Sequence, residues 1–174
     1  MRITVIRATV IAAGIFAILP GCNDRAANTK QGRGDASQLL SPEQVRAQVQ
    51  DAVHAYTEAI NGADVSTVLA LYSRGSDATT VANGDITRGW ERIRAETDST
   101  LPGLQGRFRF ALGSIDVVPL GSQHALAIAP FALTAARQGG EAQLRGAITL
   151  VFQRADSGWK IIHEHSSTAP GRQR

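Results

Sequence analysis

The sequence predicts one α+β domain in which three N-terminal helices pack on one side of a curved antiparallel sheet. Apolar residues recur at helical spacing between residues 41 and 101. After Gly103 the chain instead alternates polar and apolar residues or is rich in β-forming residues, with turn-forming stretches between the runs. Helices followed by a series of strands are typical of α+β proteins with an antiparallel sheet. The 174 residues suffice for one domain with terminal extensions.

The first helix is predicted to begin after Ser41. Ser41 is suited to cap the helix, Pro42 fits the first helical position, and Gln44 completes a capping box. Its apolar stripe consists of Val45, Val49, Val53, Tyr56 and Ile60. We expect the helix to end at Asn61 and Gly62, because both residue types adopt the left-handed conformation readily.

The elements that follow are shorter. Asp64 is expected to cap a second helix, whose apolar face carries Val65, Val68, Leu69 and Tyr72. A short strand is expected over residues 77–82, with a turn at the Asn-Gly-Asp stretch 83–85. The third helix ends at Pro102 and Gly103, and one of its faces carries Trp90, Ile93, Thr97 and Leu101.

The second half of the chain contains five predicted strands. They cover residues 107–112, 115–118, 124–133, 144–152 and 159–165. Pro130 cannot donate to a strand ladder, so we expect a bulge or bend there.

The last two strands form a hairpin whose register can be predicted. A turn over residues 155–158 places Phe152 opposite Ile161, which in turn predicts two further pairs. These pairs are Leu150 with His163 and Ile148 with His165. Side chains alternate between the faces of a strand, so the register predicts that both histidines face the helices and that Glu164 faces away.

The first 21 residues have the layout of a secretory signal peptide. A positively charged start precedes an apolar run over residues 8–20, which is too short for an unaided membrane span. The stretch Leu-Pro-Gly-Cys at 19–22 resembles the lipobox of bacterial lipoproteins, in which the cysteine is lipidated. We therefore expect a protein of the bacterial cell envelope that faces the periplasm, anchored by a lipid on Cys22, with a flexible tether over residues 22–40. An uncleaved anchor is the alternative.

Charge and cysteine content exclude some classes of function. The net charge of +3 falls to +1 once Arg2 and Arg7 of the expected signal peptide are removed. The remaining basic residues are scattered along the chain, so a nucleic-acid partner is not expected. A single cysteine cannot form an intramolecular disulfide.

Three stretches resemble the SnoaL-like branch of the nuclear transport factor 2-like superfamily, which includes ketosteroid isomerase. They are residues 55–73, 86–95 and 146–167. The resemblance covers a domain over residues 41–168 and implies a cone-shaped fold, with a pocket between the first helix, the third helix and the concave face of the sheet. It also implies a homodimer. Residues 169–174 are expected to form a disordered tail.

The resemblance allows the ketosteroid isomerase mechanism to be tested by position. That mechanism uses a carboxylate base together with an oxyanion hole made from a tyrosine and a protonated aspartic acid. Tyr56 matches the tyrosine, but the two acids should fall near Ala82 and Ile148. Because neither residue is acidic, this mechanism is not expected.

Five residues are candidates for the pocket wall: Tyr56, Tyr72, Trp90, His163 and His165. The two histidines are also the candidate catalytic residues, since neutral imidazoles exchange protons near neutral pH. The alternative is a structural role, in which both are hydrogen-bonded within the pocket wall.

A metal site would need a third ligand beside these histidines, and His54 and His124 are candidates from elsewhere in the chain. The pattern of the sequence does not bring either one close, so no metal and no cofactor is predicted.

The sequence thus predicts an envelope-anchored domain whose pocket binds a small, largely apolar molecule. One alternative is a lyase, hydratase or hydrolase that uses His163 and His165 as acid and base. Another is a non-catalytic dimerisation or interaction module. The expected partners are the small molecule, a second copy of the chain, and the membrane through the lipid anchor.

Overall fold

The computed structural model describes residues 39–137 and 140–169. The expected signal peptide, Cys22, all but the last two residues of the tether and the tail from residue 170 onward lie outside the described residues. Within the described ranges, no helix has both the length and the apolar character needed to cross a membrane.

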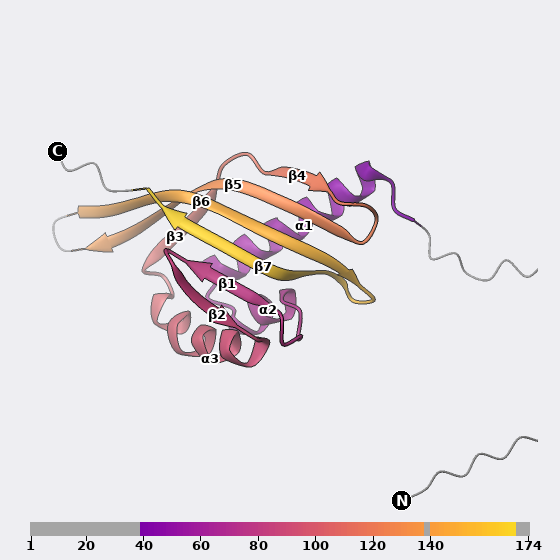
Figure 1. Ribbon diagram of the computed structural model, residues 1–174. Coiled ribbons are helices and arrows are strands. Elements are labelled where there is room, and N and C mark those ends of the chain that lie inside the picture. The colour runs from indigo at the N-terminus through magenta and orange to yellow at the C-terminus, as the bar shows by residue number, and fades with distance from the viewer. Residues whose placement is uncertain (1–38, 138–139, 170–174) are drawn as a thin grey trace, which may run out of the picture. The chain divides into compact units, whose positions relative to one another are not determined.

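The described chain has the expected order of helices first and most strands afterwards (Figure 1). The helices are α1 (Pro42–Asn61), α2 (Val65–Leu71), α3 (Trp90–Thr100) and the 3₁₀ turn η1 (Pro102–Leu104). The strands are β1 (Thr79–Ala82), β2 (Asp85–Arg88), β3 (Phe108–Leu112), β4 (Asp116–Pro119), β5 (His124–Arg137), β6 (Gly140–Ala155) and β7 (Gly158–Thr168).

The caps of the first two helices follow from local sequence. The Ser41 hydroxyl accepts from the backbone N–H of Gln44, and the Gln44 side chain accepts from the backbone N–H of Ser41 at 2.8 Å, which confirms the capping box. The expected left-handed residue lies one position later: Gly62 is right-handed, and Ala63 has φ of 50°. The Asp64 carboxylate caps α2 by accepting from the backbone N–H of Thr67 at 3.0 Å.

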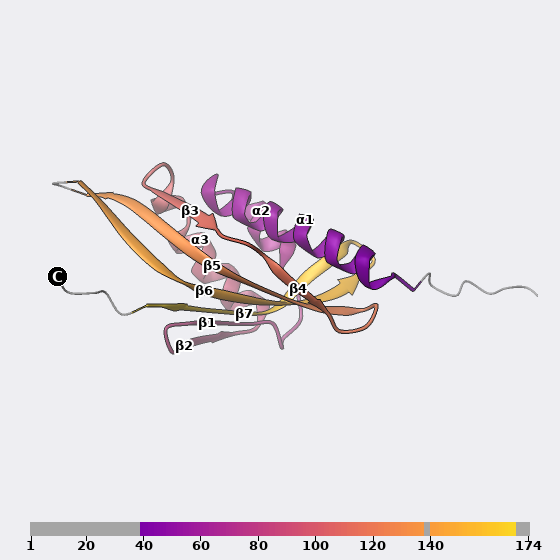
Figure 2. The same ribbon diagram turned by 90° about the horizontal axis from the view of Figure 1, so that it is seen from above.

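The sheet is mixed, which corrects the prediction of an antiparallel sheet. Its seven strands run in the order β2-β1-β7-β6-β5-β3, with β4 also paired to β5. All pairs are antiparallel except β1 and β7, which run parallel. The β1–β2 hairpin turns at Asn83 and Gly84, whose positive φ angles of 50° and 101° fit a tight two-residue turn. The sheet is curved and does not close (Figure 2).

Pro130 lies within β5 and leaves the β5–β6 ladder intact, so the expected bulge is absent on that side. On its other side the neighbour changes, because β3 ends at Leu112 and β4 begins at Asp116. The Pro130 carbonyl accepts from the backbone N–H of Gly113 at 2.8 Å. Proline thus lies where an N–H on β5 would lack a ladder partner.

The core forms between α1 and the inner face of the sheet, with α3 packed beside β1 and β2 (Figures 1 and 2). The α1 side of the core consists of Val45, Val49, Val53, Tyr56 and Ala59. The strand side includes Ala125, Ala127, Ala129, Ile148, Leu150, Phe152, Trp159 and Ile161. The alanines of β5 leave room for the helix to approach the sheet closely.

The register of the last hairpin changes at a β-bulge. Phe152 pairs with Ile161 as predicted, but the next pair is Val151 with His163, so Ile162 is an extra residue on β7. Beyond this point Leu150 pairs with Glu164. The predicted pairs of Leu150 with His163 and Ile148 with His165 are therefore wrong, because one inserted residue shifts every later side chain to the other face.

A glycine-to-alanine pair tests the packing of this sheet. A Cβ on Gly146 would overlap the backbone oxygen of Ser167 and lie 2.6 Å from Cζ of Phe131, whereas a Cβ on Gly103 meets no atom within 4 Å. Gly146→Ala should lower the free energy of unfolding by about 1–3 kcal/mol, the usual cost of overpacking, and Gly103→Ala should not lower it. Urea unfolding measures both, and equal effects would contradict the packing described.

Candidate functional site

A cavity of about 300 Å³ lies between the helices and the inner face of the sheet. Its wall is mainly apolar and includes Ile60, Val68, Ile93, Leu101, Phe108 and Leu133. These residues come from α1, α2, α3, the segment after α3, β3 and β5. A mainly apolar concave site with few polar groups is typical of small-molecule sites, and this volume is at the lower end of their range.

The polar centre of the cavity is Glu164 of β7. Tyr56 donates a hydrogen bond from its hydroxyl to Oε2 of Glu164 at 3.0 Å, and the Tyr72 hydroxyl donates to the same oxygen. Both tyrosines are 5% exposed. Two buried phenols thus hold one carboxyl group in the wall of the cavity.

Each member of this cluster is positioned by a different element. Tyr56 belongs to the apolar stripe of α1, and Tyr72 directly follows α2. The backbone of Tyr72 forms a parallel bridge with Ile161, and the Ser73 N–H donates to the Ile161 carbonyl at 2.9 Å. Glu164 faces inward because the bulge at Ile162 precedes it. The cluster therefore depends on contacts between residues distant in sequence.

The surroundings of Glu164 change its acidity. Burial raises the pKa of the carboxyl above its usual value, and the negative charge of Glu96 raises it further, whereas hydrogen bonds from Tyr72 and Tyr56 act in the opposite direction. Burial, followed by the charge of Glu164, raises the pKa of both tyrosines well above 10. The phenols therefore remain protonated donors at physiological pH.

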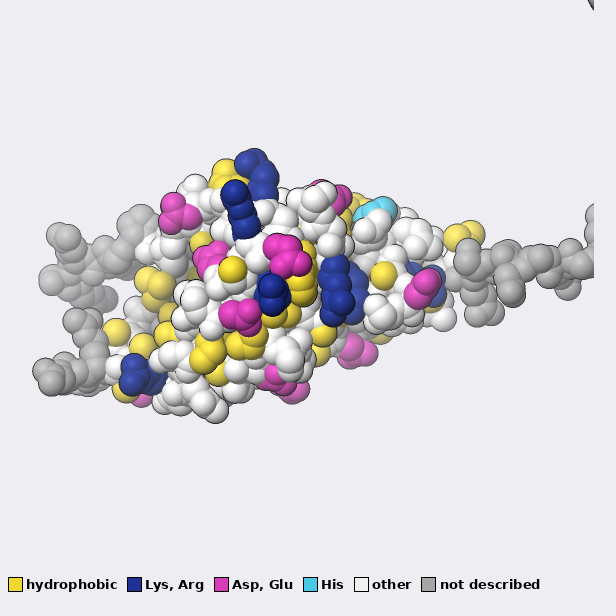
Figure 3. Space-filling model, turned by 90° about the horizontal axis from the view of Figure 1, so that it is seen from below, with side chains coloured by type: hydrophobic (Ala, Val, Ile, Leu, Met, Phe, Trp, Pro, Cys, Tyr) yellow, Lys and Arg dark blue, Asp and Glu magenta, His cyan; other side chains and the backbone are white. Residues whose placement is uncertain are grey.

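The wall of the cavity also includes exposed residues. Ala82, Glu96, Thr100 and Leu104 line the cavity and are exposed. Oε2 of Glu96 accepts from the Thr87 hydroxyl at 2.8 Å, which holds the carboxylate beside β2. Figure 3, a view from the helix side, shows acidic and basic side chains interspersed with hydrophobic ones. That face therefore has no single sign of charge.

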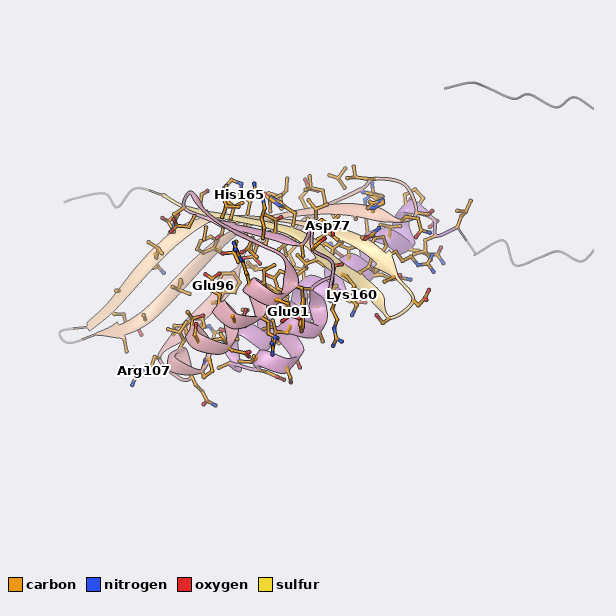
Figure 4. The ribbon with its side chains drawn as sticks, turned by 60° about the horizontal axis from the view of Figure 1, so that its bottom comes forward. Asp77, Glu91, Glu96, Arg107, Lys160 and His165 are labelled. Carbon is orange, nitrogen blue, oxygen red and sulfur yellow. The ribbon has the colours of Figure 1, made fainter. Side chains whose placement is uncertain are left out.

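Of the five predicted pocket residues, Tyr56 and Tyr72 line the cavity, whereas Trp90, His163 and His165 do not. The prediction that the two histidines face the helices is wrong, because the bulge turns them to the outer face of the sheet. His165 is exposed there, on the side away from the helices (Figure 4). His163 is half-buried in a cross-strand row with Val151 and Thr79.

Trp90 lies outside the cavity, at the start of α3. Its ring is flanked by the guanidinium groups of Arg74 at 5.2 Å and Arg94 at 5.5 Å from the ring centre. Its indole nitrogen is buried and has no hydrogen-bond partner within the described part of the chain. Trp90 therefore anchors α3 to the loop after α2.

Sequence reasoning missed Glu164. Strict alternation excluded it from the inner face, although it is the single carboxylate within the final strand of the chain. Ala82, where an acid was sought, does line the cavity, but the carboxyl comes from the paired strand instead: Glu164 is in register with Thr80. Among the described residues, no group of three or more His, Cys, Asp or Glu side chains could hold a metal ion.

Several solved structures have the same fold as this domain. A nuclear transport factor 2-like superfamily protein from Salmonella enterica has a TM-score of 0.66 at 19% identity, covering 75% of this chain and 94% of its own. A candidate dehydratase of the same class from Streptomyces avermitilis also has a TM-score of 0.66, at 21% identity over 75% of this chain and 100% of its own. A candidate aromatic ring hydroxylase from Novosphingobium aromaticivorans has a TM-score of 0.63 at 19% identity, covering 76% of this chain and 94% of its own. At these identities the likeness concerns the fold: this is a nuclear transport factor 2-like α+β domain.

Within that class, the model of the SnoaL-like domain matches residues 49–171. The chain therefore belongs to the SnoaL-like domain family, as its sequence pattern indicated. No curated protein matches the sequence.

Replacing Glu164 with Gln tests the burial of its charge. A raised native pKa means that the folded state binds the proton more tightly than the unfolded state, so stability falls as pH rises from the unfolded value through the native one. Glu164→Gln removes this dependence. Relative to the wild type, the free energy of unfolding of the variant should rise by about 1.4 kcal/mol for each unit by which the native pKa is raised. The full increase should appear at pH values above the native pKa, and no increase should appear below the pKa of the unfolded state.

The measurement is urea unfolding at pH 4 and pH 8. Glu91→Gln is the matched control, since Glu91 lies on the exposed side of α3 and pairs with Arg94 at 3.1 Å. A stability difference for Glu164→Gln that does not change with pH would contradict a buried, perturbed carboxyl.

Proposed function

We propose that the protein binds a small, largely apolar molecule in this cavity and orients it through one polar group on Glu164. The observation that carries the proposal is a half-buried carboxyl, held by hydrogen bonds from Tyr56 and Tyr72, in the wall of a mainly apolar cavity. Apolar walls supply most of the binding free energy, and a few fixed polar groups supply orientation.

The geometry supports this function because Glu164 keeps unused hydrogen-bonding capacity. Both tyrosines donate to Oε2, and no described side chain donates to Oε1. Oε1 is therefore available to accept a hydrogen bond from a ligand group that enters the cavity.

We further propose that the domain is held at the bacterial envelope, facing the periplasm, by a lipid on Cys22. The support is the sequence pattern alone, a signal-like start followed by a lipobox-like stretch. The expected homodimer stays a prediction. The outer face of the sheet, where Val118 and Ile128 are 41% and 39% exposed, is the surface that would serve it.

Blocking the mouth of the cavity tests ligand binding. Ala82 is exposed and lines the cavity, so Ala82→Trp should fill its mouth. With indole as the probe, a small apolar molecule with one N–H donor, calorimetry should show binding to the wild type and at least about tenfold weaker binding to the variant.

Ala95→Trp, on an exposed position of α3 outside the cavity, should bind indole like the wild type. Circular dichroism checks that both variants fold. Indole that binds the wild type and Ala82→Trp with equal affinity would reject the proposed function.

The second candidate function is acid–base catalysis on the bound molecule, with Glu164 in place of the histidines. Burial raises the pKa of the Glu164 carboxyl, so its carboxylate is a stronger base than an ordinary one and is suited to take a proton from carbon. A solved structure of similar fold is a candidate dehydratase, and dehydration requires such a proton transfer.

This candidate predicts proton exchange on a simple ketone. Glu164 would take an α-proton from cyclohexanone, and return of a deuteron from D₂O to the resulting enolate would leave the α-carbon labelled. NMR should show faster labelling with the wild type, and Glu164→Gln should lower the enzymatic rate by at least about 100-fold, with Glu91→Gln unchanged. A wild-type rate equal to that of buffer would reject the candidate.

A further inference from the structure

The polar groups of the cavity are acceptors rather than donors. Its two carboxyl groups, Glu164 and Glu96, come from β7 and α3. Oε1 of Glu164 and Oε1 of Glu96 receive no hydrogen bond from the described side chains, since the bonds from Tyr56, Tyr72 and Thr87 all reach Oε2.

The hydroxyl donors of the cavity wall are almost all occupied. The two tyrosines donate to Glu164. The Thr97 hydroxyl donates to the Ile93 carbonyl at 2.8 Å, and the Thr100 hydroxyl donates to the Glu96 carbonyl at 2.8 Å. The Thr80 hydroxyl is the one side-chain donor of the wall without a partner among the described residues. A ligand that needs several donors would therefore find few.

No basic side chain balances these carboxyl groups. Neither a lysine nor an arginine belongs to the described cavity wall. Arg94, on the same helix as Glu96, instead pairs with Glu91 and stacks on Trp90. Figure 4 shows Glu96 and Glu91 on the same helix, with Arg107 at the far end of the helical layer. The cavity is thus both acidic and apolar.

Building on the proposed ligand site, we propose that the cavity selects a cationic amine with a small apolar body. The ammonium group donates to Oε1 of Glu164 and neutralises the carboxyl groups, and the apolar body contacts Val68, Ile93 and Leu133. The faces of the Tyr56 and Tyr72 rings can also attract a cation through cation–π interactions. A carboxylate or phosphate ligand is excluded, because it would meet two acids and no base.

A bound cation would give the two acids of the cavity wall a common partner. The charge of Glu96 makes ionisation of Glu164 less favourable, which is a cost to the empty site. A cation between them converts this repulsion into two attractions. A neutral ligand offers no such compensation.

The test uses three probes of nearly equal size that differ in one group: benzylamine, benzyl alcohol and benzoate. They are titrated at pH 7 into the purified full-length protein, with binding followed by calorimetry and by NMR, and with indole as the reference. Benzylamine should bind at least about tenfold more tightly than benzyl alcohol, and benzoate should not bind.

Variants assign this preference to the cavity. Glu164→Gln and Glu96→Gln should each reduce the ratio of benzylamine to benzyl alcohol affinity by at least about fivefold, and Glu91→Gln should leave it unchanged. Glu96 is exposed, so its variant keeps the test available if Glu164→Gln does not fold.

The outcomes separate this inference from the proposed function. If indole binds but benzyl alcohol or benzoate matches benzylamine, the amine preference is overturned and the ligand site stands. If the preference for benzylamine is unchanged in both Glu164→Gln and Glu96→Gln, it does not arise in the cavity, and the proposed amine site is overturned as well. If no probe binds, indole included, the proposed function fails together with the inference.

Discussion

One extra residue in β7 decides which chemistry faces the helices. Up to Ile161 the last strand directs Trp159 and Ile161 into the core, and regular alternation would next direct His163 inward. The bulge at Ile162 instead leaves His163 and His165 on the outer face and turns Glu164 toward the helices. The hydrogen bonds of the two tyrosines, the raised pKa and the acidic cavity all depend on this single insertion, which re-aims a side chain as bulges next to functional sites commonly do.

Local patterns predicted what local interactions determine. The capping box, the N-cap at Asp64 and the apolar stripe that carries Tyr56 are properties of short segments, and the structure has all three. The bulge could not be predicted in this way, because it depends on how β6 and β7 pair. The residues at the bulge, Val151, Phe152 and Ile162, include no glycine that would indicate it. The parallel pairing of β1 with β7 likewise joins segments about 80 residues apart in sequence.

Backbone hydrogen-bonding groups are satisfied locally at two places, around Pro130 in β5 and at the end of α1. Pro130 interrupts no ladder because β3 has ended and β4 has not yet begun on that side of β5. Asn61, the last residue of α1, satisfies the backbone of β3 in both directions: its amide donates to the Phe110 carbonyl and accepts from the Phe110 N–H, each at 2.8 Å. These contacts hold the end of α1 and β3 together where the cavity wall passes from helix to strand.

A half-buried glutamate on a mainly apolar face needs a physical reason. Leu150 lies directly opposite Glu164 and is 1% exposed, so a leucine at 164 would extend the core without the cost of desolvating a carboxyl. Two phenols reduce that cost at one oxygen only, and the second oxygen faces the cavity. Proteins depart from consistent apolar patterning mainly at functional sites. Oε1 has no hydrogen-bond partner among the described residues, which is the physical basis for proposing a ligand group at this position.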